Sequence, residues 1–496
     1  MKNFRILLVY PNEPLQGIAP GNMALLSAFL KNDGFDVRLF DTTIYINKEK
    51  ISNDKLRENL GQVKKSNFDD YIKPKTSNIY EDFINLVNTY KPNLIGLSVI
   101  DGTIKFALSF IEKIKHLNIP VITGGVGTTF NYNKILLSGL VDYVCIGEGE
   151  KALVELSNKL FNGEPTNNIQ NIYALDINGN VIKNSLRPPI DLDSLPIPDF
   201  DIYEDWRFYR PFMGNVMRMI QIDTDRGCPF SCTYCAAPGI RKIYKEEKHN
   251  YFRIKSTDKL FEEIKFLVKK YDINFLWMSS ETFMARSEKK FKIFAKRYIK
   301  EIGLPFWTSN RLDTFTPEKT KLLAEMGCKA ISVGVEHGSE SIRNSLLNKN
   351  VKNSTIINAI KLIAQYPDMV PSINNMIGIP DETRETIFET IELNRKIIAI
   401  SGNNHTMTSF IFVPFHGTKL REVCIEKGYL NEDEELSASY FEESKLNMPS
   451  ISREELKGLE RVMMLYILLP KSYWPDIKIA ETDDEMFETL MQLIKK

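Results

Sequence analysis

The sequence predicts an α/β protein in three parts: a doubly wound parallel sheet in residues 1–163, a partial barrel of six strands and helices in residues 216–425, and a small, mostly helical region in residues 426–496. Three observations support this prediction. Short apolar runs alternate with stretches of helical periodicity, which is typical of βαβ units. The alternation occurs twice, once on each side of a proline-rich segment. Glycine-containing loops follow several predicted strands, at the edge of a parallel sheet where ligands bind.

The first series contains five short apolar runs, with helix-like stretches such as 22–31 and 105–115 between them. The predicted strands are 5–10, 37–40, 94–99, 121–123 and 143–146. Strands joined by helices pair in parallel, and a parallel sheet needs helices on both faces. No Gly-x-Gly-x-x-Gly follows the first strand, so a dinucleotide-binding fingerprint is absent.

Residues 164–215 are expected to link the two series. Within them, segment 187–200 holds four prolines and three aspartates. Proline fixes φ and disfavours helix in the residue before it. We therefore expect an extended segment that crosses from the first domain to the second.

The second series contains six more strand-like runs, at 217–224, 275–278, 306–308, 330–335, 372–377 and 406–412. Helix-like stretches separate them, at 256–271, 289–301, 317–326, 353–365 and 382–400. Six strands with five intervening helices suit a partial barrel better than a closed eightfold one. In residues 426–496, four aromatic residues either cap a pocket or belong to the core, and we favour the core: Tyr440, Phe441, Tyr466 and Trp474.

The composition is that of an ordinary globular protein with balanced charge. Hydrophobic residues make up 43% and charged residues 26%, and 64 basic side chains balance 64 acidic ones. This balance gives no reason to expect nucleic-acid or anionic-membrane binding. The apolar run 6–10 is too short for a signal peptide, and the run 462–469 is far below the roughly 18 residues that span a bilayer. We therefore expect a cytoplasmic protein with no membrane span and no nucleic-acid partner.

Three of the six cysteines, Cys228, Cys232 and Cys235, follow the first predicted strand of the barrel with the spacing CxxxCxxC. Three thiolates on one tight loop can face one iron–sulfur cubane. A complete set for a [4Fe–4S] cluster is four cysteines, so three leave one iron open to another ligand. The alternative is a zinc site, but zinc prefers four ligands in paired spacings. No second pair exists, and the nearest downstream histidine, His249, is distant in the sequence.

With the aromatic Tyr234 before its last cysteine, this motif resembles the signature of the radical S-adenosylmethionine (SAM) superfamily. The resemblance implies a [4Fe–4S] cluster whose open iron is chelated by the methionyl amine and carboxylate of SAM, with Tyr234 in the same site. One electron from the cluster then splits SAM and yields a 5′-deoxyadenosyl radical. The cofactor carries this chemistry, and the protein positions it. An external one-electron reductant of the flavodoxin or ferredoxin type is the expected partner.

Further SAM-binding residues follow from the same resemblance. Glu281 stands where the family has a Gly-Gly-Glu segment for the methionyl amine, although both glycines are serines here, and the alternative is a carboxylate at a helix N-terminus. Arg311 is expected to clamp the methionyl carboxylate, with a surface or interdomain salt bridge as the alternative. Glu336, in a Gly-Val-Glu segment, is expected at the ribose or amine, and Gly378 near the adenine. We expect Glu382 to cap the helix that follows.

A parallel α/β domain in front of such a core resembles the cobalamin-binding subgroup of radical SAM enzymes. The residues expected at cobalamin follow the five strand ends: Pro11, Thr42, Ser98, Gly124, Gly125, Thr128, Gly147, Glu148, Gly149 and Glu150. The glycines would let backbone N–H groups approach the corrin and its nucleotide tail, and the alternative is that they only form tight turns. No Asp-x-His-x-x-Gly motif is present, so no histidine of this domain is expected to ligate cobalt.

For the subgroup, the resemblance implies a methyltransferase. Cobalamin takes a methyl group from one SAM, a second SAM yields the radical that removes hydrogen from an unactivated carbon, and the substrate radical takes the methyl from methylcobalamin. One alternative keeps both cofactors for cyclisation or rearrangement without methyl transfer. Another is a non-catalytic iron–sulfur or corrinoid carrier or sensor. The substrate is expected to be an unspecified small molecule, lipid or peptide.

Overall fold

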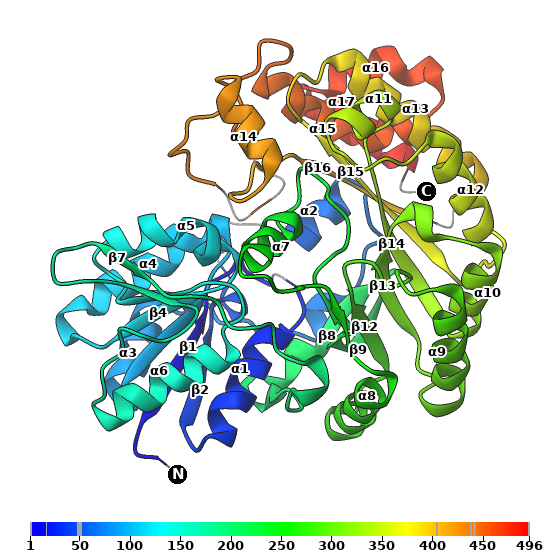
Figure 1. Ribbon diagram of the computed structural model, residues 1–496. Coiled ribbons are helices and arrows are strands. Elements are labelled where there is room, and N and C mark those ends of the chain that lie inside the picture. The colour runs from blue at the N-terminus through cyan, green and yellow to red at the C-terminus, as the bar shows by residue number, and fades with distance from the viewer. Residues whose placement is uncertain are drawn as a thin grey trace.

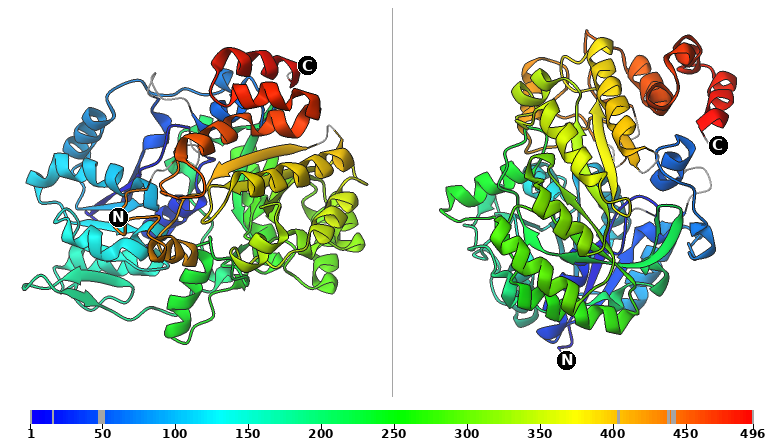
Figure 2. Two further views of the ribbon diagram at one scale, coloured as in Figure 1. Left: turned by 90° about the horizontal axis from the view of Figure 1, so that it is seen from above. Right: turned by 90° about the vertical axis from the view of Figure 1, so that its right-hand side faces the viewer.

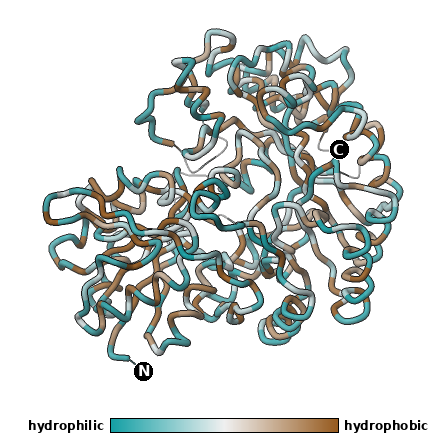
Figure 3. Tube along the Cα trace, in the orientation of Figure 1, coloured by the Kyte–Doolittle hydropathy of each residue, from teal (hydrophilic) through white to brown (hydrophobic). Residues whose placement is uncertain are grey.

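Two seven-stranded sheets stand side by side in the structure, a computed structural model (Figure 1). It describes residues 2–15, 17–46, 52–402, 405–436, 439 and 443–494. In Figure 1 the blue and cyan first domain lies at the left, the green and yellow second domain at the right, and the red C-terminal helices above the second. Apolar and hydrophilic segments alternate along the helices in Figure 3, as expected for helices that pack one face on a sheet.

The first sheet has the strand order β2-β1-β3-β4-β5-β6-β7. Its strands are β1 (Arg5–Tyr10), β2 (Asp36–Asp41), β3 (Leu94–Ser98), β4 (Val121–Gly124), β5 (Tyr143–Cys145), β6 (Ile172–Leu175) and β7 (Val181–Lys183). The strands from β2 to β5 pair in parallel. The order reverses between β1 and β3, which creates a ligand-binding crevice at the carboxyl ends of the strands.

Helices cover both faces of this sheet, which confirms the predicted doubly wound fold. On one face α1 (Gly21–Asn32) contacts α6 (Glu150–Asn162). On the other, α4 (Ile104–Ile114) contacts both α3 (Ile79–Tyr90) and α5 (Val126–Leu137).

The expected linker, residues 164–215, carries strands of both sheets. Strands β6 and β7 form an antiparallel hairpin that extends the first sheet beyond β5. Strand β8 (Tyr209–Phe212) pairs antiparallel with β9 of the second sheet. The first sheet is therefore mixed at one edge and not parallel throughout. Strands this short carry too few residues to show a clear hydrophobic period.

The second sheet has the order β16-β15-β14-β13-β12-β9-β8 and curls into an open barrel whose edges are β16 and β8. Its six parallel strands are β9 (Asn215–Asp223), β12 (Phe275–Ser279), β13 (Phe306–Asn310), β14 (Cys328–Glu336), β15 (Val370–Ile377) and β16 (Thr406–Ile411). Five predicted helices connect them: α8 (Thr257–Tyr271), α9 (Glu288–Glu301), α10 (Pro317–Glu325), α12 (Asn353–Ile363) and α13 (Arg384–Ser401). The predicted partial barrel is confirmed.

Several short elements escaped the sequence analysis: α2 (Asn53–Asn59), α7 (Ala237–Glu246), α11 (Glu340–Ser345) and the two-stranded ribbon of β10 (Asp225–Arg226) and β11 (Arg253–Ile254). The expected role of Glu382 as a helix cap is wrong. Thr383 is the N-cap of α13, whereas the Glu382 carboxylate accepts hydrogen bonds from the backbone N–H groups of Gly378 and Ile379. It stabilises the turn before the helix.

The C-terminal region contains α14 (Lys419–Glu426), α15 (Arg453–Leu468), α16 (Trp474–Ala480) and α17 (Asp484–Ile494), and α15 contacts α13 of the barrel. The ring of Trp474 lies 5.3 Å from that of Phe388 and 5.6 Å from that of Tyr466. Tyr466 and Trp474 thus pack with the core, as favoured, while Tyr440 and Phe441 lie outside the described residues. Among the described residues, no helix has both the length and the apolar character needed to cross a bilayer.

Candidate functional site

The three clustered cysteines lie on one loop between β10 and α7, beyond the carboxyl end of β9. Gly227 starts this loop with a φ of 82°, and a Cβ there would lie 2.8 Å from the Tyr251 ring. Only glycine fits that position, because both the backbone conformation and the space exclude a side chain. All three thiols are half-buried and free of disulfides. The loop thus presents three sulfur atoms toward the end of the barrel.

Polar groups surround these thiols. The backbone N–H of Ala237 donates to Cys235 Sγ at 3.4 Å, and the Arg311 guanidinium donates to Cys232 Sγ at 3.3 Å. Burial raises the pKa of Cys228 and raises that of Cys235 to about 12, and the Glu281 carboxylate acts in the same direction. In the part of the chain that is described, no three His, Cys, Asp or Glu side chains form the ligand set of a single metal ion. Three thiols on one loop, beside hydrogen-bond donors that favour thiolate, are the donor set that a cubane requires.

Glu281 follows the second parallel strand of the barrel, β12. The Glu281 side chain is exposed on one side and surrounded by protein on the others. Partial desolvation raises its pKa, and the nearby Asp225 carboxylate raises it further. No described residue pairs with the Glu281 carboxylate, although Ser280 beside it donates to Asp225 at 2.6 Å. A carboxylate without a partner beside the cysteine loop is available to a cationic ligand group.

Glu336, in contrast, is held on two sides at the end of β14. Its Oε1 accepts a hydrogen bond from the Tyr234 hydroxyl at 3.0 Å and pairs with Lys349 Nζ at 2.5 Å. The backbone of Glu336 has a φ of 65°, an uncommon conformation for a residue other than glycine. The Tyr234 contact connects the cysteine loop to the fourth parallel strand of the barrel.

Arg311 and Gly378 have neighbours within the protein. The Arg311 guanidinium forms two hydrogen bonds with the Asp313 carboxylate, at 3.0 and 2.9 Å, and stacks 3.8 Å from the Phe230 ring. Its fork is therefore occupied by Asp313 in this structure. Gly378 has a φ of 80°, and a Cβ there would lie 3.3 Å from a methyl group of Leu456 in α15. Gly378 lies against the C-terminal helices.

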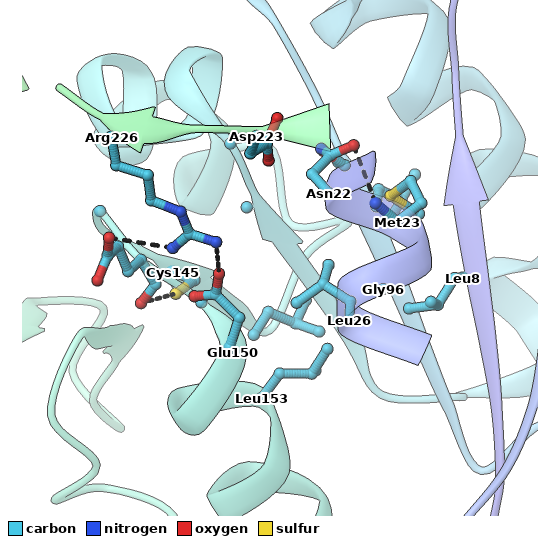
Figure 4. Close-up of a pocket in the computed structure, with 18 of the residues that line it drawn as sticks. Leu8, Asn22, Met23, Leu26, Gly96, Cys145, Glu150, Leu153, Asp223 and Arg226 are labelled. Carbon is cyan, nitrogen blue, oxygen red and sulfur yellow. Dashed lines mark hydrogen bonds and ion pairs between the residues drawn. The ribbon is translucent and has the colours of Figure 1, made fainter. Parts of the chain in front are cut away.

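A cavity of about 250 Å³ lies at the carboxyl edge of the first sheet, where that sheet meets the barrel (Figure 4). Seven of the residues expected at cobalamin line it: Ser98, Gly124, Gly125, Gly147, Glu148, Gly149 and Glu150. Its other walls include Leu8, Met23, Leu26 and Leu153 from the first domain. A mostly apolar surface with glycine backbone at one end suits part of a corrinoid, whereas pockets that enclose a drug-sized ligand measure roughly 300–1,000 Å³.

The other three residues expected at cobalamin, Pro11, Thr42 and Thr128, do not line this cavity. All three are buried. The Thr42 hydroxyl accepts a hydrogen bond from the backbone N–H of Asn12 at 2.7 Å, and the Thr128 hydroxyl donates to the carbonyl of Gly124 at 3.1 Å. Their contacts shape the loops after β1 and β4.

The cavity glycines divide into two kinds. A Cβ on Gly125 would lie 2.6 Å from the Val99 carbonyl oxygen, and one on Gly147 would clash with the Tyr244 hydroxyl. These two are required by packing within the protein. A Cβ on Gly124 or Gly149 would meet only Cys145, at 3.7 and 3.4 Å, and both glycines line the cavity.

An ion-pair cluster that was not predicted from the sequence lies where the two domains meet. Arg226 of β10 lies 3.1 Å from a Glu148 oxygen and 2.6 Å from a Glu150 oxygen, and Arg253 of β11 also pairs with Glu148. Figure 4 shows Arg226 reaching from the barrel domain toward Glu150 of α6. Burial disfavours the charged form of Arg226, but Glu150 and Glu148 outweigh it and raise its pKa.

Glu148 responds in the opposite sense, because Arg253 and Arg226 overcome its burial and lower its pKa. Both carboxylates that were expected at cobalamin are thus neutralised by arginines of the second domain. Arg226 precedes Cys228 by two positions, but no spacing rule connects it with the first domain, so sequence reasoning had no signal for this contact.

Two family descriptions match the chain. The B12 binding domain matches residues 16–157, and the Radical SAM superfamily matches residues 223–393. An uncharacterized methyltransferase of Pyrococcus horikoshii is 27% identical over 360 residues, which cover 71% of this chain and 73% of the relative. An anaerobic magnesium-protoporphyrin IX monomethyl ester cyclase of Rubrivivax gelatinosus is 28% identical over 348 residues, covering 68% of this chain but only 60% of the relative.

Solved structures share the fold. The radical SAM methyltransferase TsrM from Kitasatospora setae, solved with cobalamin and a [4Fe–4S] cluster bound, has a TM-score of 0.62 at 18% identity and covers 85% of this chain and 75% of TsrM. The cobalamin-dependent SAM radical enzyme OxsB, with aqua-cobalamin and SAM bound, has a TM-score of 0.65 at 15% identity and covers 99% of this chain and 70% of OxsB. At sequence identities this low, the similarity shows a shared fold and nothing more.

Proposed function

Because this chain belongs to the cobalamin-binding radical SAM enzymes, with [4Fe–4S], SAM and cobalamin as cofactors, we propose that it adds a methyl group to an unactivated carbon of its substrate. The observation that carries this proposal is the direct link between the two candidate sites. Arg226, two residues before Cys228, is bonded to Glu148 and Glu150 beside the first-sheet cavity. These ion pairs, together with that of Arg253 to Glu148, hold the cysteine loop next to the cavity, and reactions at two cofactors tolerate little misplacement.

When bound, the cluster and SAM supply a carbon-centred radical, and the corrinoid supplies the methyl group. We assign the cluster to Cys228, Cys232 and Cys235. The Glu281 carboxylate suits the methionyl amine, because it has no partner among the described residues and a charge-assisted hydrogen bond would offset the desolvation that raises its pKa. Glu336 is already oriented by Tyr234 and Lys349, so it can accept one further hydrogen bond without first being ordered.

The remaining residues expected at SAM and at cobalamin are assigned to different roles. Arg311 supports the cluster through Cys232, and binding the methionyl carboxylate would require it to share its guanidinium with Asp313. Gly378 would place its backbone near the adenine by the family resemblance. On the cobalamin side we assign Ser98, Gly124 and Gly149 to direct contact, since they line the cavity and neither tight packing nor an arginine accounts for them. The other expected residues shape the walls and loops of the cavity: Pro11, Thr42, Gly125, Thr128, Gly147, Glu148 and Glu150.

A second candidate function keeps both cofactors and forms a ring without methyl transfer. The similarity to the Rubrivivax gelatinosus cyclase favours it. Both candidates need the same cysteine loop and the same first-sheet cavity, so the product distinguishes them.

The reaction also implies a partner and a compartment. An external flavodoxin or ferredoxin would deliver the single electron, and the substrate would be a small molecule, lipid or peptide. Thiolates that hold a cluster must remain reduced, so we place the working enzyme in the cytoplasm.

Anaerobic reconstitution tests the proposal. The protein would be loaded with iron, sulfide and cobalamin, reduced with flavodoxin, and given SAM with a deuterated methyl group together with a metabolite extract from its own source. We expect 5′-deoxyadenosine, S-adenosylhomocysteine and a product that carries the deuterated methyl. 5′-Deoxyadenosine with an unlabelled, cyclised product would favour the second function, and no 5′-deoxyadenosine at all would contradict both.

A pair of cysteine variants serves as the control. Cys228→Ala should abolish the cluster absorption and all three products. Cys328→Ala removes a buried thiol of β14 whose Sγ contacts the Ala330 carbonyl oxygen at 3.2 Å, and it should retain the cluster. Equal loss in both variants would show that the cysteine loop has no special role.

A further inference from the structure

A second cavity, of about 460 Å³, occupies the inside of the open barrel toward the amino ends of its strands. Its walls include Met219 of β9, Trp277 of β12, Trp307 of β13, Ser332 of β14 and Asn374 of β15. Alternate residues of a strand share one face, so these side chains lie on the same inner surface as the carboxyl-end residues beside the cysteine loop. The cavity is separate from the one at the first sheet.

Two tryptophans form the flat wall of this chamber. The rings of Trp277 and Trp307 stack with centroids 5.1 Å apart and planes within 3°. Both are only partly buried, at the edge of a small apolar cluster that includes Met219 and Phe275. Within the described part of the chain, neither indole N–H has a hydrogen-bond acceptor. Large half-exposed aromatic surface inside a barrel is available to a flat apolar ligand.

Cationic side chains from the first domain close the chamber. The segment with α2 reaches under the barrel, where Arg57 donates to the Thr408 hydroxyl of β16 at 2.7 Å. In the right-hand view of Figure 2 this blue segment lies beside the barrel strands, below the red C-terminal helices. A second contact joins the same segments: the backbone carbonyl of Gln62 accepts a hydrogen bond from the backbone N–H of Met407 at 3.4 Å.

The charge of Arg57 is incompletely neutralised. Among the described residues its only ion pair is with Asp54 at 3.9 Å, and Asp54 pairs more closely with Arg210 at 2.7 Å. The Arg57 Nε is buried, and no residue in the described ranges supplies it with a hydrogen-bond acceptor. Burial lowers the pKa of Arg57, and the distant Asp54 offsets this only in part. A buried donor without an acceptor is unfavourable until a ligand supplies one.

The chamber continues into a basic surface groove. A neighbouring hollow of about 580 Å³ shares Glu58, Val63, Lys64 and Thr406 with the chamber walls. The groove adds Lys55 and Lys65. Across the two hollows these lysines, Arg57 and Arg210 outnumber the carboxylates of Asp54 and Glu58. Such a field attracts anions.

We propose that this chamber binds an amphipathic anion, with a flat apolar part against Trp277 and Trp307 and a carboxylate or phosphate group beside Arg57 and Lys64. The proposal rests on the proposed function in one respect: such a molecule would be the substrate, held from the amino ends of the strands so that its other end points toward the cysteine loop. Arg57 then acts as a specificity-determining residue supplied by the first domain.

Titration calorimetry on the reconstituted holoenzyme tests the chamber with three probes of one shape: naphthalene-2-carboxylate, 2-naphthyl phosphate and the neutral naphthalene-2-carboxamide. We expect at least one of the two anions to bind at least about tenfold more tightly than the amide, because only an anion can form a charge-assisted hydrogen bond with Arg57 in which both partners are charged. If one anion binds more tightly than the other, its charged group, carboxylate or phosphate, is the one that the chamber recognises. Equal binding of all three probes, or no binding, would overturn the proposal.

Three variants locate the site. Arg57→Gln should remove the tenfold preference for the anion while amide binding changes less than about twofold. Lys64→Gln, at an exposed position that does not endanger folding, should weaken anion binding in the same direction. Arg297→Gln changes an exposed arginine of α9 and should leave all three affinities unchanged. Anion binding that is identical in Arg57→Gln, Lys64→Gln and Arg297→Gln would place the anion elsewhere.

The chamber and the proposed function fail independently in these experiments. Probe binding without any 5′-deoxyadenosine from the unmodified enzyme would contradict the function and leave the chamber as a binding site. 5′-Deoxyadenosine formation without any preference for the anionic probes would contradict the chamber alone.

Discussion

Carboxylates at the domain junction and at the end of the barrel have different surroundings. At the junction, Glu148 and Glu150 are each paired with arginine, and the pKa of Glu148 is lowered. Beside the cysteine loop, Glu281 has no partner among the described residues, and its pKa is raised. The first arrangement holds two domains together, and the second leaves a charge available to a ligand. Charge removal should therefore destabilise the fold at the junction and impair binding at the barrel end.

The largest expected effect is at Arg226. Arg226→Ala leaves Glu150 buried without its arginine, and removing one partner of a buried pair typically costs about 3–5 kcal/mol. The free energy of unfolding, measured by urea denaturation, should fall by that amount. Arg297→Ala is the matched control, because this arginine pairs with Glu301 and Asp258 on the surface and its loss should cost at most about 1 kcal/mol. Similar losses in both variants would contradict the structural role of the junction.

The backbone of the loop after β4, beside the first-sheet cavity, gives the next prediction. Gly125→Ala combines a φ of 99° with a Cβ 2.6 Å from the Val99 carbonyl oxygen, so strain and overpacking together should cost about 3 kcal/mol. Gly163→Ala also changes a glycine with a positive φ, here 69° in the left-handed region, but its Cβ would meet nothing within 4 Å. It should cost only about 1 kcal/mol. Urea denaturation of both proteins measures the difference, and equal losses would mean that the loop after β4 adapts.

A third carboxylate, outside both regions, isolates the effect of burial alone. Glu460 in α15 is 2% exposed. Within the part of the chain that the structure describes, its only ion pair is with Lys457 at 3.7 Å, and one of its oxygens has no hydrogen-bond partner. Burial raises its pKa to about 7. Because the folded state holds this proton more tightly than the unfolded state, its contribution to stability is fully present below pH 4.5 and is lost as the pH rises to about 7.

The variant Glu460→Gln should lack this dependence. At pH 8 it should be more stable than the unmodified protein by about 2–3 kcal/mol, and near pH 4.5 the two should be alike. Urea denaturation at a series of pH values measures the difference between the two proteins. A difference that stays constant between pH 4.5 and pH 8 would contradict the raised pKa.

The contrast between regions also explains what the sequence could predict. Strands β9 and β12–β16 and their helices follow regular hydrophobic periods, and every predicted boundary lies within two residues of the observed one. The cysteine loop was found because its ligands are close in the chain. The junction could not be found, because Glu150 and Arg226 meet only through the packing of two domains. The same holds for Arg57, which reaches Thr408 from the other end of the chain.

The local sequence pattern also gave wrong expectations where tertiary contacts determine the partner of a side chain. Glu382 has the spacing of a helix cap, yet its carboxylate is bound by the Gly378 turn and by His337 at 2.8 Å. Thr42 and Thr128 follow strand ends, as binding residues do, but their hydroxyls bond to backbone groups of the loops. A position at a strand end predicts proximity to a site, and only the direction of the side chain decides contact.

Glu281→Gln is the smallest expected change and the sharpest test of the comparison. Glutamine keeps the shape of the side chain and removes the charge, so SAM binding should weaken by about tenfold or more if the methionyl amine pairs with Glu281. Stability should be unchanged or slightly higher, because the charge has no partner to lose. Titration calorimetry of SAM with the reconstituted enzyme measures the affinity, and urea denaturation measures the stability. Glu318→Gln, at the surface ion pair with Lys292, should alter neither. Unchanged SAM affinity would mean that the methionyl amine binds another group. A stability loss as large as that of Arg226→Ala would mean that Glu281 stabilises the fold, and the two regions would then not differ.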